Sequence, residues 1–313
     1  MDVSVLIGTY NRAPLLERTL AALGAQEYPA SLRWEIVVVD NNSQDGTARC
    51  VDAFAARSPV PVRRVHETRQ GVSHARNRGI EEARGHILAF TDDDVLPASD
   101  WVAGVPAAID RWAADGVGGR ILPLWETPPP AWLAQNRRLL DHLALMDFAG
   151  SGLLALPLPA GPQVWGANMA FRRDLFDRVG TFDPCRGMRG RKLYRGEDTD
   201  LVNRALAAGL RIAYDPRLTV SHRIGADRMR RAYFCKLSFD RGECDVQFGP
   251  AARGRTLGGA PRWMYRAVVT DLGRWLTAEL LGRPDALTRR LDWFDLAGQL
   301  SGYRKLRGGA PLR

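Results

Sequence analysis

Short apolar stretches rich in β-branched residues alternate with helix-length stretches through the first ninety residues, and this alternation constrains the fold most. The strand-like stretches are residues 3–10, 34–40, 61–67 and 86–92. The helix-length stretches between them are residues 13–26, 47–58 and 71–85. Gly85 is expected to end the last of these helices. The alternation predicts βαβ crossovers, and therefore an α/β fold with a mainly parallel central sheet and helices on both faces.

Polar residues follow each predicted strand. They are "TYNR" (9–12), "DNNSQDGT" (40–47), "HETRQG" (66–71) and "TDDD" (91–94). Because the carboxyl ends of parallel strands meet at one edge of a sheet, we expect these residues to converge on a ligand site. Ordinary turn chemistry explains most of them equally well, but it explains the three adjacent aspartates badly.

Beyond residue 97 the pattern becomes irregular. Residues 115–133 and 153–171 are rich in Pro, Gly and Trp, which predicts loops over the sheet. Residues 172–180 indicate a helix ended by Gly180, and a Gly/Arg-rich loop at 186–196 leads into a second helix. After a strand within 211–225, the chain is basic and helical in character. We expect one large α/β domain at 1–225 and a helical extension at 226–313.

Positive charge is concentrated at the carboxyl end of the chain. The net charge is +9, and residues 251–313 hold 12 Lys and Arg against 5 Asp and Glu. Residues 261–284 predict a basic amphipathic helix, which either contacts an anionic membrane surface or packs on the domain with its arginines solvated. No nucleic-acid recognition motif accompanies this charge, so no nucleic acid partner is expected.

The chain shows no sequence signal for secretion or for crossing a membrane. No apolar run approaches the ~20 residues that span a bilayer. The first residues resemble a strand and lack the basic region of a signal peptide. We expect a cytoplasmic protein that is either free or peripheral on the inner face of the membrane.

The stretch "GHILAFTDDDVLP" (85–97) carries the strongest chemical signal. Three adjacent carboxylates at the end of a buried strand are costly unless positive charge compensates them. They suit a hard divalent cation such as Mg²⁺ or Mn²⁺, with substrate phosphates completing its ligand shell. The alternative is a surface acidic turn balanced by Arg76 or Arg78. Local sequence leaves both interpretations open.

Familiar nucleotide-binding fingerprints are absent from the sequence. No G-x-G-x-x-G follows the first strand and no G-x-x-x-x-G-K-[ST] occurs, which argues against dinucleotide oxidoreductases and P-loop enzymes. A nucleotidyltransferase is an alternative, but it would need a Gly-rich, Lys-containing loop where "GTYNRAPLL" (8–16) stands. A metal–diphosphate site on a Rossmann-like sheet remains the leading interpretation.

Five blocks of the sequence resemble the family 2 glycosyltransferases, which have the GT-A fold. They are "VSVLIGTYNR", "EIVVVDNNSQDGT", "GVSHARNRGIEEARGHILAFTDDDVLP", "GANMAFRRDLFDRVGTFD" and "GEDTDLVNRALAAG". The resemblance implies an inverting, metal-dependent transferase of hexosyl type that moves a sugar from a nucleotide-diphosphate donor, expected to be a UDP-sugar. The acceptor would be a hydroxyl of a glycan, a lipid-linked molecule or a small molecule. It also implies a nucleotide-binding half at 1–97 and an acceptor half at 98–225.

The resemblance assigns roles to residues by position. Those assigned to the donor nucleotide and diphosphate are Thr9, Tyr10, Asn11, Asp40, Asn42, Arg76, Asp92 and Asp93. Asp94 would ligate the Mn²⁺ or Mg²⁺ cofactor, and His222 matches a late histidine that completes the metal shell in some members. The alternative for His222 is a surface histidine without a ligand.

"GEDTD" (196–200) supplies the carboxylate that glycosyl transfer needs to remove the acceptor proton. We expect Asp198 to be this general base, with Glu197 orienting the acceptor or the loop. The alternative is that both are ordinary acids in the first turn of a helix. The preceding loop, 186–196, either closes over the diphosphate or stays solvated. A catalytically silent nucleotide-sugar-binding module is the remaining alternative, and the intact acids argue against it.

Overall fold

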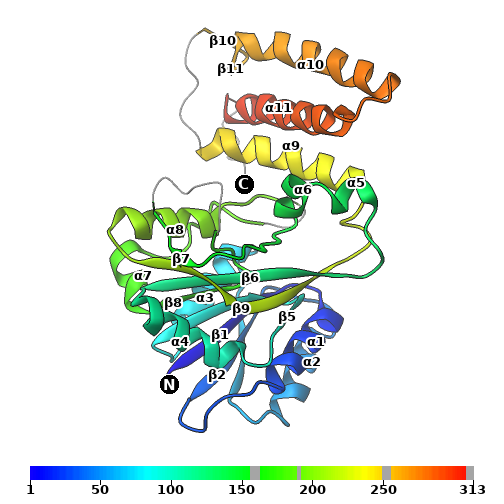
Figure 1. Ribbon diagram of the computed structural model, residues 1–313. Helices are drawn as coiled ribbons and strands as arrows, with labels where there is room; N and C mark the ends of the chain where they lie inside the picture. Colours follow the sequence, from blue (N-terminus) through cyan, green and yellow to red (C-terminus); the bar gives the residue numbers. More distant parts are fainter. Residues whose placement is uncertain (156–162, 189–191, 249–254, 308–313) are drawn as a thin grey trace. The chain divides into compact units, whose positions relative to one another are not determined.

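The computed structural model describes residues 1–155, 163–188, 192–248 and 255–307 (Figure 1). They form two compact units. The first comprises Met1–Pro184 and Gly196–Gly225, and the second comprises Cys185–Arg195 and Ala226–Arg313. Cys185–Arg195, which lies within the large domain expected at 1–225, belongs to the second unit because Lys192 and Tyr194 bond to its helix α9 (Arg231–Phe248).

The first ninety residues build the parallel part of the sheet. The strands are β1 (Val3–Thr9), β2 (Trp34–Asp40), β3 (Val62–His66) and β4 (Ile87–Asp92), in the order β3-β2-β1-β4. The connecting helices are α1 (Ala13–Gly24), α2 (Thr47–Ala55) and α3 (Val72–Glu82). All four strands pair in parallel, so the predicted α/β fold is confirmed.

Strand register brings the predicted polar residues to one edge. Thr9 of β1 pairs with Asp40 of β2, and Gly8 pairs with Asp92 of β4. Asp40 pairs in turn with His66 of β3. The carboxyl ends of the four strands are therefore level with one another.

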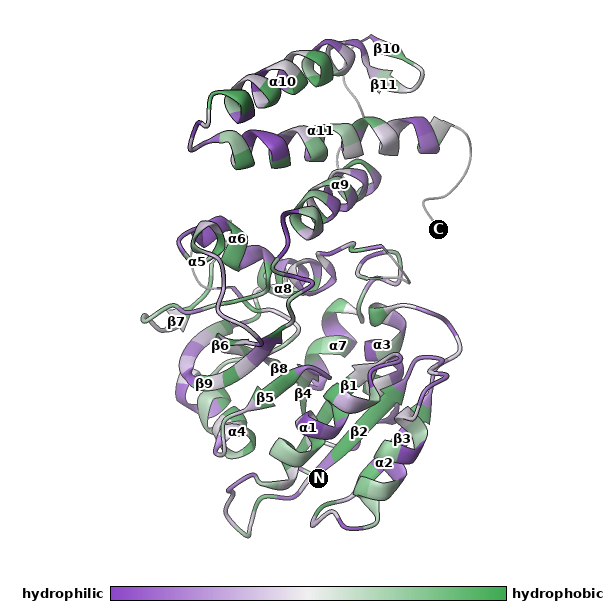
Figure 2. Cartoon of the chain, turned by 90° about the vertical axis from the view of Figure 1, so that its right-hand side faces the viewer, coloured by the Kyte–Doolittle hydropathy of each residue, from purple (hydrophilic) through white to green (hydrophobic). Residues whose placement is uncertain are grey.

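Hydrophobic side chains cover both faces of this sheet. Leu6, Leu88 and Phe90 belong to one core cluster with residues of α3, α7 (Asp174–Val179) and α8 (Glu197–Ala207). The alternate side chains, such as Val5 and Ile7, are also fully buried, and α1, α2 and α4 (Trp101–Trp112) cover that face. Figure 2 shows β2 as hydrophobic over most of its length. Successive strand residues point to opposite faces, so burial on both sides requires such continuous apolar strands.

The second half of the sheet is mixed, and it corrects the loop prediction for residues 115–133 and 153–171. These stretches contain the ten-residue strand β6 (Gly116–Trp125) and β8 (Met169–Arg172); residues 156–162 lie outside the described part. Glycines in β6 permit close packing, not a loop, because a Cβ on Gly116 would lie 2.3 Å from Phe171 and one on Gly119 would lie 2.1 Å from the Leu218 carbonyl oxygen.

Within the described residues the full sheet runs β3-β2-β1-β4-β8-β6-β9-β5. β8 is antiparallel to both neighbours, and β6 pairs in parallel with the long β9 (Ile212–Ile224). β5 (Val95–Pro97) and β7 (Gly152–Leu153) pair with β9 antiparallel. Two short helices, α5 (Ala131–Ala134) and α6 (Arg137–His142), follow β6.

Gly85 does not end α3 as predicted. The helix ends at Glu82, and Ala83 already has extended backbone. A Cβ on Gly85 would lie 2.5 Å from the Ser4 backbone nitrogen, so this glycine allows the chain to pass close to β1. Gly180 does end its helix as predicted, with φ of 77° after α7.

The described residues of the second unit form three long helices and a small hairpin. The helices are α9, α10 (Arg262–Leu280) and α11 (Ala286–Arg307), and the hairpin pairs β10 (Thr256–Leu257) with β11 (Ala260–Pro261). α9 and α11 meet backbone to backbone, since a Cβ on Gly298 would lie 2.0 Å from the Phe239 carbonyl oxygen. Among the described residues, no helix combines the length and hydropathy that a bilayer crossing requires.

Candidate active site

The turn after β4 places two buried carboxylates around one arginine. Asp93 and Asp94 are 4% and 6% exposed. Nη1 of Arg12 lies 3.0 Å from Oδ1 of Asp93 and 3.0 Å from Oδ2 of Asp94. One guanidinium therefore serves two carboxylates.

The local electrostatics leave Asp93 short of positive charge. Burial raises the pKa of Asp93 to about 6, although Arg12 opposes this and Asp94 adds to it. The two carboxylates also raise the pKa of Arg12, against the effect of its burial, so this side chain stays cationic. A second positive charge would be stabilised at this turn.

Hydroxyl groups from the first strand and helix fix the turn. Thr9, predicted to line the nucleotide pocket, is buried, and its Oγ1 donates to Oδ2 of Asp93 at 2.8 Å. Thr19 of α1 donates to the backbone carbonyl of Asp93 at 3.0 Å and to that of Val95 at 2.9 Å. Thr9 thus orients an acid at the strand ends.

His222 lies beside Asp94, although 128 residues separate them in the sequence. β5 and β9 pair antiparallel with His222 opposite Val95. This pairing places Nε2 of His222 3.4 Å from Oδ1 of Asp94, and both side chains are 5% exposed. The sheet therefore buries the two predicted metal ligands next to each other.

Arg76 links the strand-end acids to the acids of α8. It projects from α3, and its side chain is 8% exposed. Nη1 lies 2.7 Å from Oε1 of Glu197, and Nη2 lies 3.6 Å from Oδ1 of Asp92. A Cβ on Gly166 would lie 1.9 Å from Nη2 of Arg76, so only glycine leaves room for the guanidinium there.

The two acids of α8 have different environments. Glu197 is 8% exposed and is paired with Arg76. Burial raises its pKa, and Asp198 adds to the shift while Arg76 opposes it. Asp198 is half-buried; its Oδ2 accepts from the Gly166 backbone at 3.1 Å and its Oδ1 from the Thr199 backbone at 2.7 Å.

The remaining predicted donor residues lie on the loops after β1 and β2. Asn11 joins these loops, since its Oδ1 accepts from the Gln44 backbone at 2.7 Å. Asp40 is 4% exposed, and its Oδ1 accepts from the Ser43 backbone at 2.9 Å. Asn42 and Asn11 both adopt positive φ, at 70° and 53°.

Tyr10 and Asn42 complete this group. Tyr10 is 43% exposed, so its ring is available to a ligand. Oδ1 of Asn42 lies 3.1 Å from Nε2 of His66, which joins the loop after β2 to the end of β3. The loops after the first three strands therefore lie side by side, as the parallel register predicts.

Sequence reasoning missed three residues that organise the site. Arg12 stands in the "TYNR" block but received no role. Asn41 bonds the carbonyls of Glu67 and Arg69 at 2.9 and 2.8 Å, which joins the loops after β2 and β3. Gly166 stands in the "GANMAF" block, and only its contacts with Arg76 and Asp198 reveal its importance.

The donor set at the turn has the chemistry of a partial cation site. Asp94 offers carboxylate oxygen and His222 offers an imidazole nitrogen, which suits Mn²⁺. Among the described residues, no group of three His, Cys, Asp or Glu side chains converges to hold a metal ion by protein ligands alone. The residues present fit a cation that takes its other ligands from a bound molecule.

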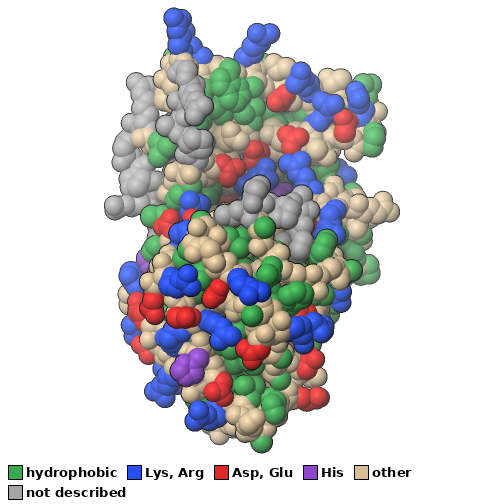
Figure 3. Space-filling view, turned by 60° about the vertical axis from the view of Figure 1, so that its left-hand side comes forward, with side chains coloured by type: hydrophobic (Ala, Val, Ile, Leu, Met, Phe, Trp, Pro, Cys, Tyr) green, Lys and Arg blue, Asp and Glu red, His purple; other side chains and the backbone are tan. Residues whose placement is uncertain are grey.

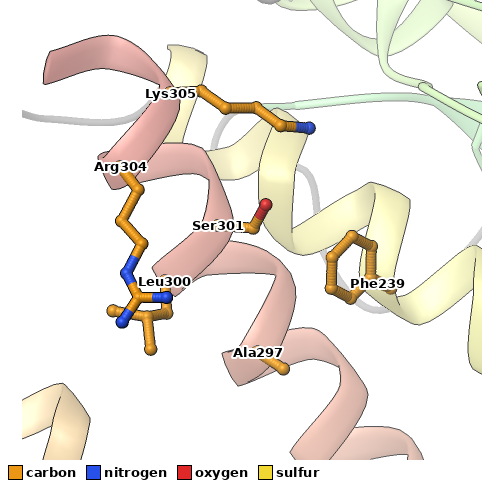
Figure 4. A pocket seen from close by; sticks show the side chains of 6 residues that line it. All are labelled: Phe239, Ala297, Leu300, Ser301, Arg304 and Lys305. Atoms are coloured by element: carbon orange, nitrogen blue, oxygen red, sulfur yellow. The ribbon is translucent and has the colours of Figure 1, made fainter. Parts of the chain in front are cut away.

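A cavity of about 480 Å³ lies in the second unit, between α9 and α11 (Figure 4). It is lined by Phe239, Ala297, Leu300, Ser301, Arg304 and Lys305. None of these residues belongs to the predicted donor, metal or catalytic set. The acids and arginines at the strand ends, and not this cavity, carry the chemistry that the sequence predicts.

The sequence of the chain is similar to those of known glycosyltransferases. It is 29% identical over 212 residues to glycosyltransferase AglE of Haloferax volcanii, an alignment that covers 68% of this chain and 64% of AglE. It is 26% identical over 293 residues to the succinoglycan biosynthesis protein ExoM of Rhizobium meliloti, covering 92% of this chain and 87% of ExoM. The chain thus spans slightly less than two thirds of AglE and most of ExoM.

Solved structures share its fold. The mannosyltransferase PcManGT of Pyrobaculum calidifontis, in complex with GDP-Man and Mn²⁺, superposes with a TM-score of 0.62 at 24% identity, covering 97% of this chain and 86% of that one. TarS 1–349 of S. aureus, in complex with UDP, superposes with a TM-score of 0.56 at 17% identity, covering 99% and 92%.

The match to a family model covers more than half of the chain. The model for glycosyl transferase family 2 matches residues 4–180, which include most of β1, the strands β2 to β8, the acidic turn and Gly166. Family membership sets the nucleotidyltransferase alternative aside. The chain belongs to glycosyl transferase family 2 and has the GT-A fold.

Proposed function

We propose that this glycosyltransferase moves a hexosyl group from a UDP-sugar to an acceptor hydroxyl, with inversion at the anomeric carbon. One observation carries the proposal: Arg76 lies between Asp92, at the end of β4, and Glu197, at the start of α8. The donor-side and acceptor-side acids, predicted from separate motifs, therefore flank one buried cation.

The donor would lie along the ends of β1, β2 and β4. Asp40 and Asn42 would meet the base, and Thr9, Tyr10 and Asn11 would line the nucleotide pocket. Cleavage of the bond between the anomeric carbon and the diphosphate leaves negative charge on the departing nucleoside diphosphate. Arg76 is buried and stays cationic, since Glu197 and Asp92 raise its pKa against the effect of burial. It would stabilise that charge without a proton transfer.

Asp94 and His222 would hold Mn²⁺ or Mg²⁺ next to the diphosphate. When bound, the cation would act as a Lewis acid toward the diphosphate oxygens. The proposal is supported by the 3.4 Å separation of the two buried side chains and by the charge deficit at Asp93. The fold neighbour PcManGT was solved with Mn²⁺ and GDP-Man.

Asp198 would act as the general base. Glu197 is committed to Arg76, whereas Asp198 is half-buried and held by two backbone N–H groups. As the acceptor oxygen attacks the anomeric carbon, its proton passes to the Asp198 carboxylate, and the bond to the diphosphate breaks. Glu197 would fix Arg76 and the start of α8.

A thermal-shift panel of nucleotide sugars, with and without Mn²⁺, tests the proposal. A ligand that binds only the folded chain raises its melting temperature by mass action. We expect UDP-sugars with Mn²⁺ to give the largest shift, Asp94→Asn to abolish its metal-dependent part, and Asp198→Asn to keep it while turnover is lost. Normal sugar transfer by both variants would contradict the assigned roles. An assay of donor hydrolysis in the presence of Mn²⁺ distinguishes an active enzyme from a catalytically silent binding module.

We further propose that the acceptor is a glycan, a lipid-linked molecule or a small molecule, and that α10 contacts the inner face of an anionic membrane. One face of α10 carries side chains at alternating intervals of four and three residues. They are Arg262, Arg266, Val269, Gly273, Leu276 and Leu280. Leu280 is 87% exposed and Val269 71%. Figure 3 shows Lys and Arg side chains beside a hydrophobic patch at the top of the view.

A bilayer interface suits this face better than a second copy of the chain does. Parallel pairing of two α10 helices would oppose their arginines, and antiparallel pairing would bury Arg262 against Leu280. A membrane surface takes leucine among the acyl chains and arginine among anionic headgroups. The acids of α10, Asp271 and Glu279, lie off the exposed row, as helical spacing places them.

Vesicle flotation of the full chain tests this contact. We expect binding to vesicles that contain phosphatidylglycerol and weaker binding to neutral vesicles or at high salt. Leu280→Glu should reduce partitioning of the chain onto the vesicles about tenfold or more, since it puts a charge where an apolar side chain would enter the bilayer. Leu153→Glu, at an exposed leucine of the first unit, is the control. Absence of vesicle binding, or dimer formation that Leu280→Glu abolishes, would contradict the proposal.

A further inference from the structure

Two buried carboxylates of α9 hold the segment that immediately precedes the proposed base. Glu243 has no exposed surface. It accepts hydrogen bonds from Nζ of Lys192 at 2.6 Å and from the Tyr194 hydroxyl at 3.2 Å. One turn earlier, Asp240 is 2% exposed and accepts from the Leu193 backbone at 3.0 Å. Three successive residues, 192–194, are therefore bonded to α9.

The same carboxylate also joins α9 to α11. The Ser301 hydroxyl donates to Glu243 at 2.7 Å, and Nζ of Lys305 forms an ion pair with it. Figure 4 shows Ser301 and Lys305 among the residues of α11 that line the cavity beside α9. Glu243 is thus the point at which segment 192–194, α9 and α11 meet.

Glu243 is fully compensated although it is buried. Burial alone would raise its pKa, but hydrogen bonds from Lys192, Lys305 and Ser301 outweigh that effect and lower the pKa to about 2. Such a saturated carboxylate holds its partners in one geometry, because moving any of them leaves a buried charge without its hydrogen bond.

Very few residues separate segment 192–194, which is bonded to α9, from the acids at the start of α8. The Cys244 thiol lies 3.6 Å from the Arg195 carbonyl oxygen, so α9 contacts residues 192–195 continuously. Gly196 alone separates Arg195 from Glu197, and it has the left-handed backbone that favours glycine, with φ of 99°. One residue spans at most about 3.6 Å, so residue 195 restricts where α8 begins.

We propose that Glu243 is a positioning residue for the Glu197–Asp198 pair: by bonding Lys192 and Tyr194 to α9 and α11, it fixes the start of α8. The inference rests on the proposed function for its effect on turnover, but not for its effect on α8. Lys192 of the loop at 186–196 is thereby engaged with α9, and residues 189–191 of that loop lie outside the described part.

The test compares Glu243→Gln with Asp295→Asn in the full chain. Asp295 of α11 pairs with Arg241 of α9 at 2.8 Å, so its loss loosens the same two helices without touching segment 192–194. We expect Glu243→Gln to lower kcat about tenfold or more, with the donor KM within about threefold, because small misplacements of a catalytic group are costly. Asp295→Asn should leave kcat unchanged, and Tyr194→Phe should give an intermediate loss.

Amide hydrogen exchange provides a readout that does not depend on activity. Peptides covering residues 196–201 should exchange faster in Glu243→Gln than in Asp295→Asn, measured well below both melting temperatures. If exchange there rises equally in both variants, or in neither, Glu243 only stabilises the helices and the inference is wrong. If exchange rises only in Glu243→Gln while Asp198→Asn keeps full turnover, the positioning role stands and the proposed base is wrong.

Discussion

The two units bury acidic residues in opposite electrostatic states. In the first unit, burial raises the pKa of Asp93 to about 6 and raises that of Glu197. In the second unit, the pKa of the equally buried Glu243 is lowered to about 2. The difference comes from the number of partners. Arg12 is shared between two carboxylates, whereas Glu243 is bonded by two lysines and two hydroxyls, of which Lys192 also pairs with Asp240.

This contrast distinguishes a carboxylate that can bind a ligand from a carboxylate that only holds neighbouring segments in place. A buried carboxylate with too little positive charge nearby is stabilised by an added cation, so the strand ends of the first unit have capacity for one. A buried carboxylate whose hydrogen bonds are all made has no such capacity and instead fixes the groups around it. Asp93 belongs to the first class and Glu243 to the second.

The largest expected effect is on turnover. Asp198→Asn should lower kcat by about 10²- to 10⁴-fold, the usual range for loss of general-base catalysis, with donor affinity nearly unchanged. Asp200→Asn is the matched control, because Asp200 lies in the same helical turn but pairs with Arg204. For both variants, steady-state transfer assays measure kcat and calorimetry measures the affinity for the donor. Equal losses of kcat in the two variants would show that Asp198 contributes only to the structure of the first turn of α8 and is not the general base.

A smaller but still large effect is expected on stability. Arg76→Gln leaves Glu197 buried without its partner, which should cost about 3–5 kcal/mol of unfolding free energy. Arg78→Gln, on the same helix, removes only surface pairs with Glu81 and Glu82 and should cost less than about 1 kcal/mol. Urea unfolding measures the difference. Similar values for the two variants would mean that the site does not depend on Arg76 for charge balance.

The acid stability of the chain should depend on the second unit. The pKa of Glu243 is about 2 in the folded chain and near 4.5 when unfolded, so its stabilisation is present above pH 4.5 and is lost as pH falls toward 2. The loss amounts to at most about 3 kcal/mol. Glu243→Gln should flatten the stability profile in that range, whereas Glu126→Gln, at a partly exposed ion pair, should not. An unchanged profile in Glu243→Gln would show that the carboxylate is not compensated as described.

Patterns of local sequence predicted the parallel half of the fold well. Apolar runs such as residues 36–39 of β2 and the amphipathic α1 are governed by burial, which the sequence pattern reports directly. Strand β6 was missed because its glycines serve close packing against Phe171 and Leu218, which are distant in sequence. Local composition cannot distinguish that use of glycine from a loop.

The candidate site was predictable where a residue stands at a strand end, and not where it acts through a distant partner. The strand-end position of Asp92, Asp93 and Asp94 followed from the register of parallel strands. Arg12 as their partner did not, since it reaches them only through the tertiary fold, whereas Arg76 was predictable as an arginine that could balance them. The engagement of Lys192 with Glu243 likewise joins residues 51 positions apart.

Manganese binding tests the central claim most directly, because it asks whether the undercompensated turn after β4 takes a cation together with a nucleoside diphosphate. Free Mn²⁺ is followed by electron paramagnetic resonance during titration of the full chain, with and without UDP or GDP. We predict that one nucleotide tightens Mn²⁺ binding about tenfold or more, and that Asp94→Asn removes this gain while Asp45→Asn, in the loop after β2, keeps it. Mn²⁺ affinity that is the same with and without nucleotide, and the same in Asp94→Asn, would contradict the account.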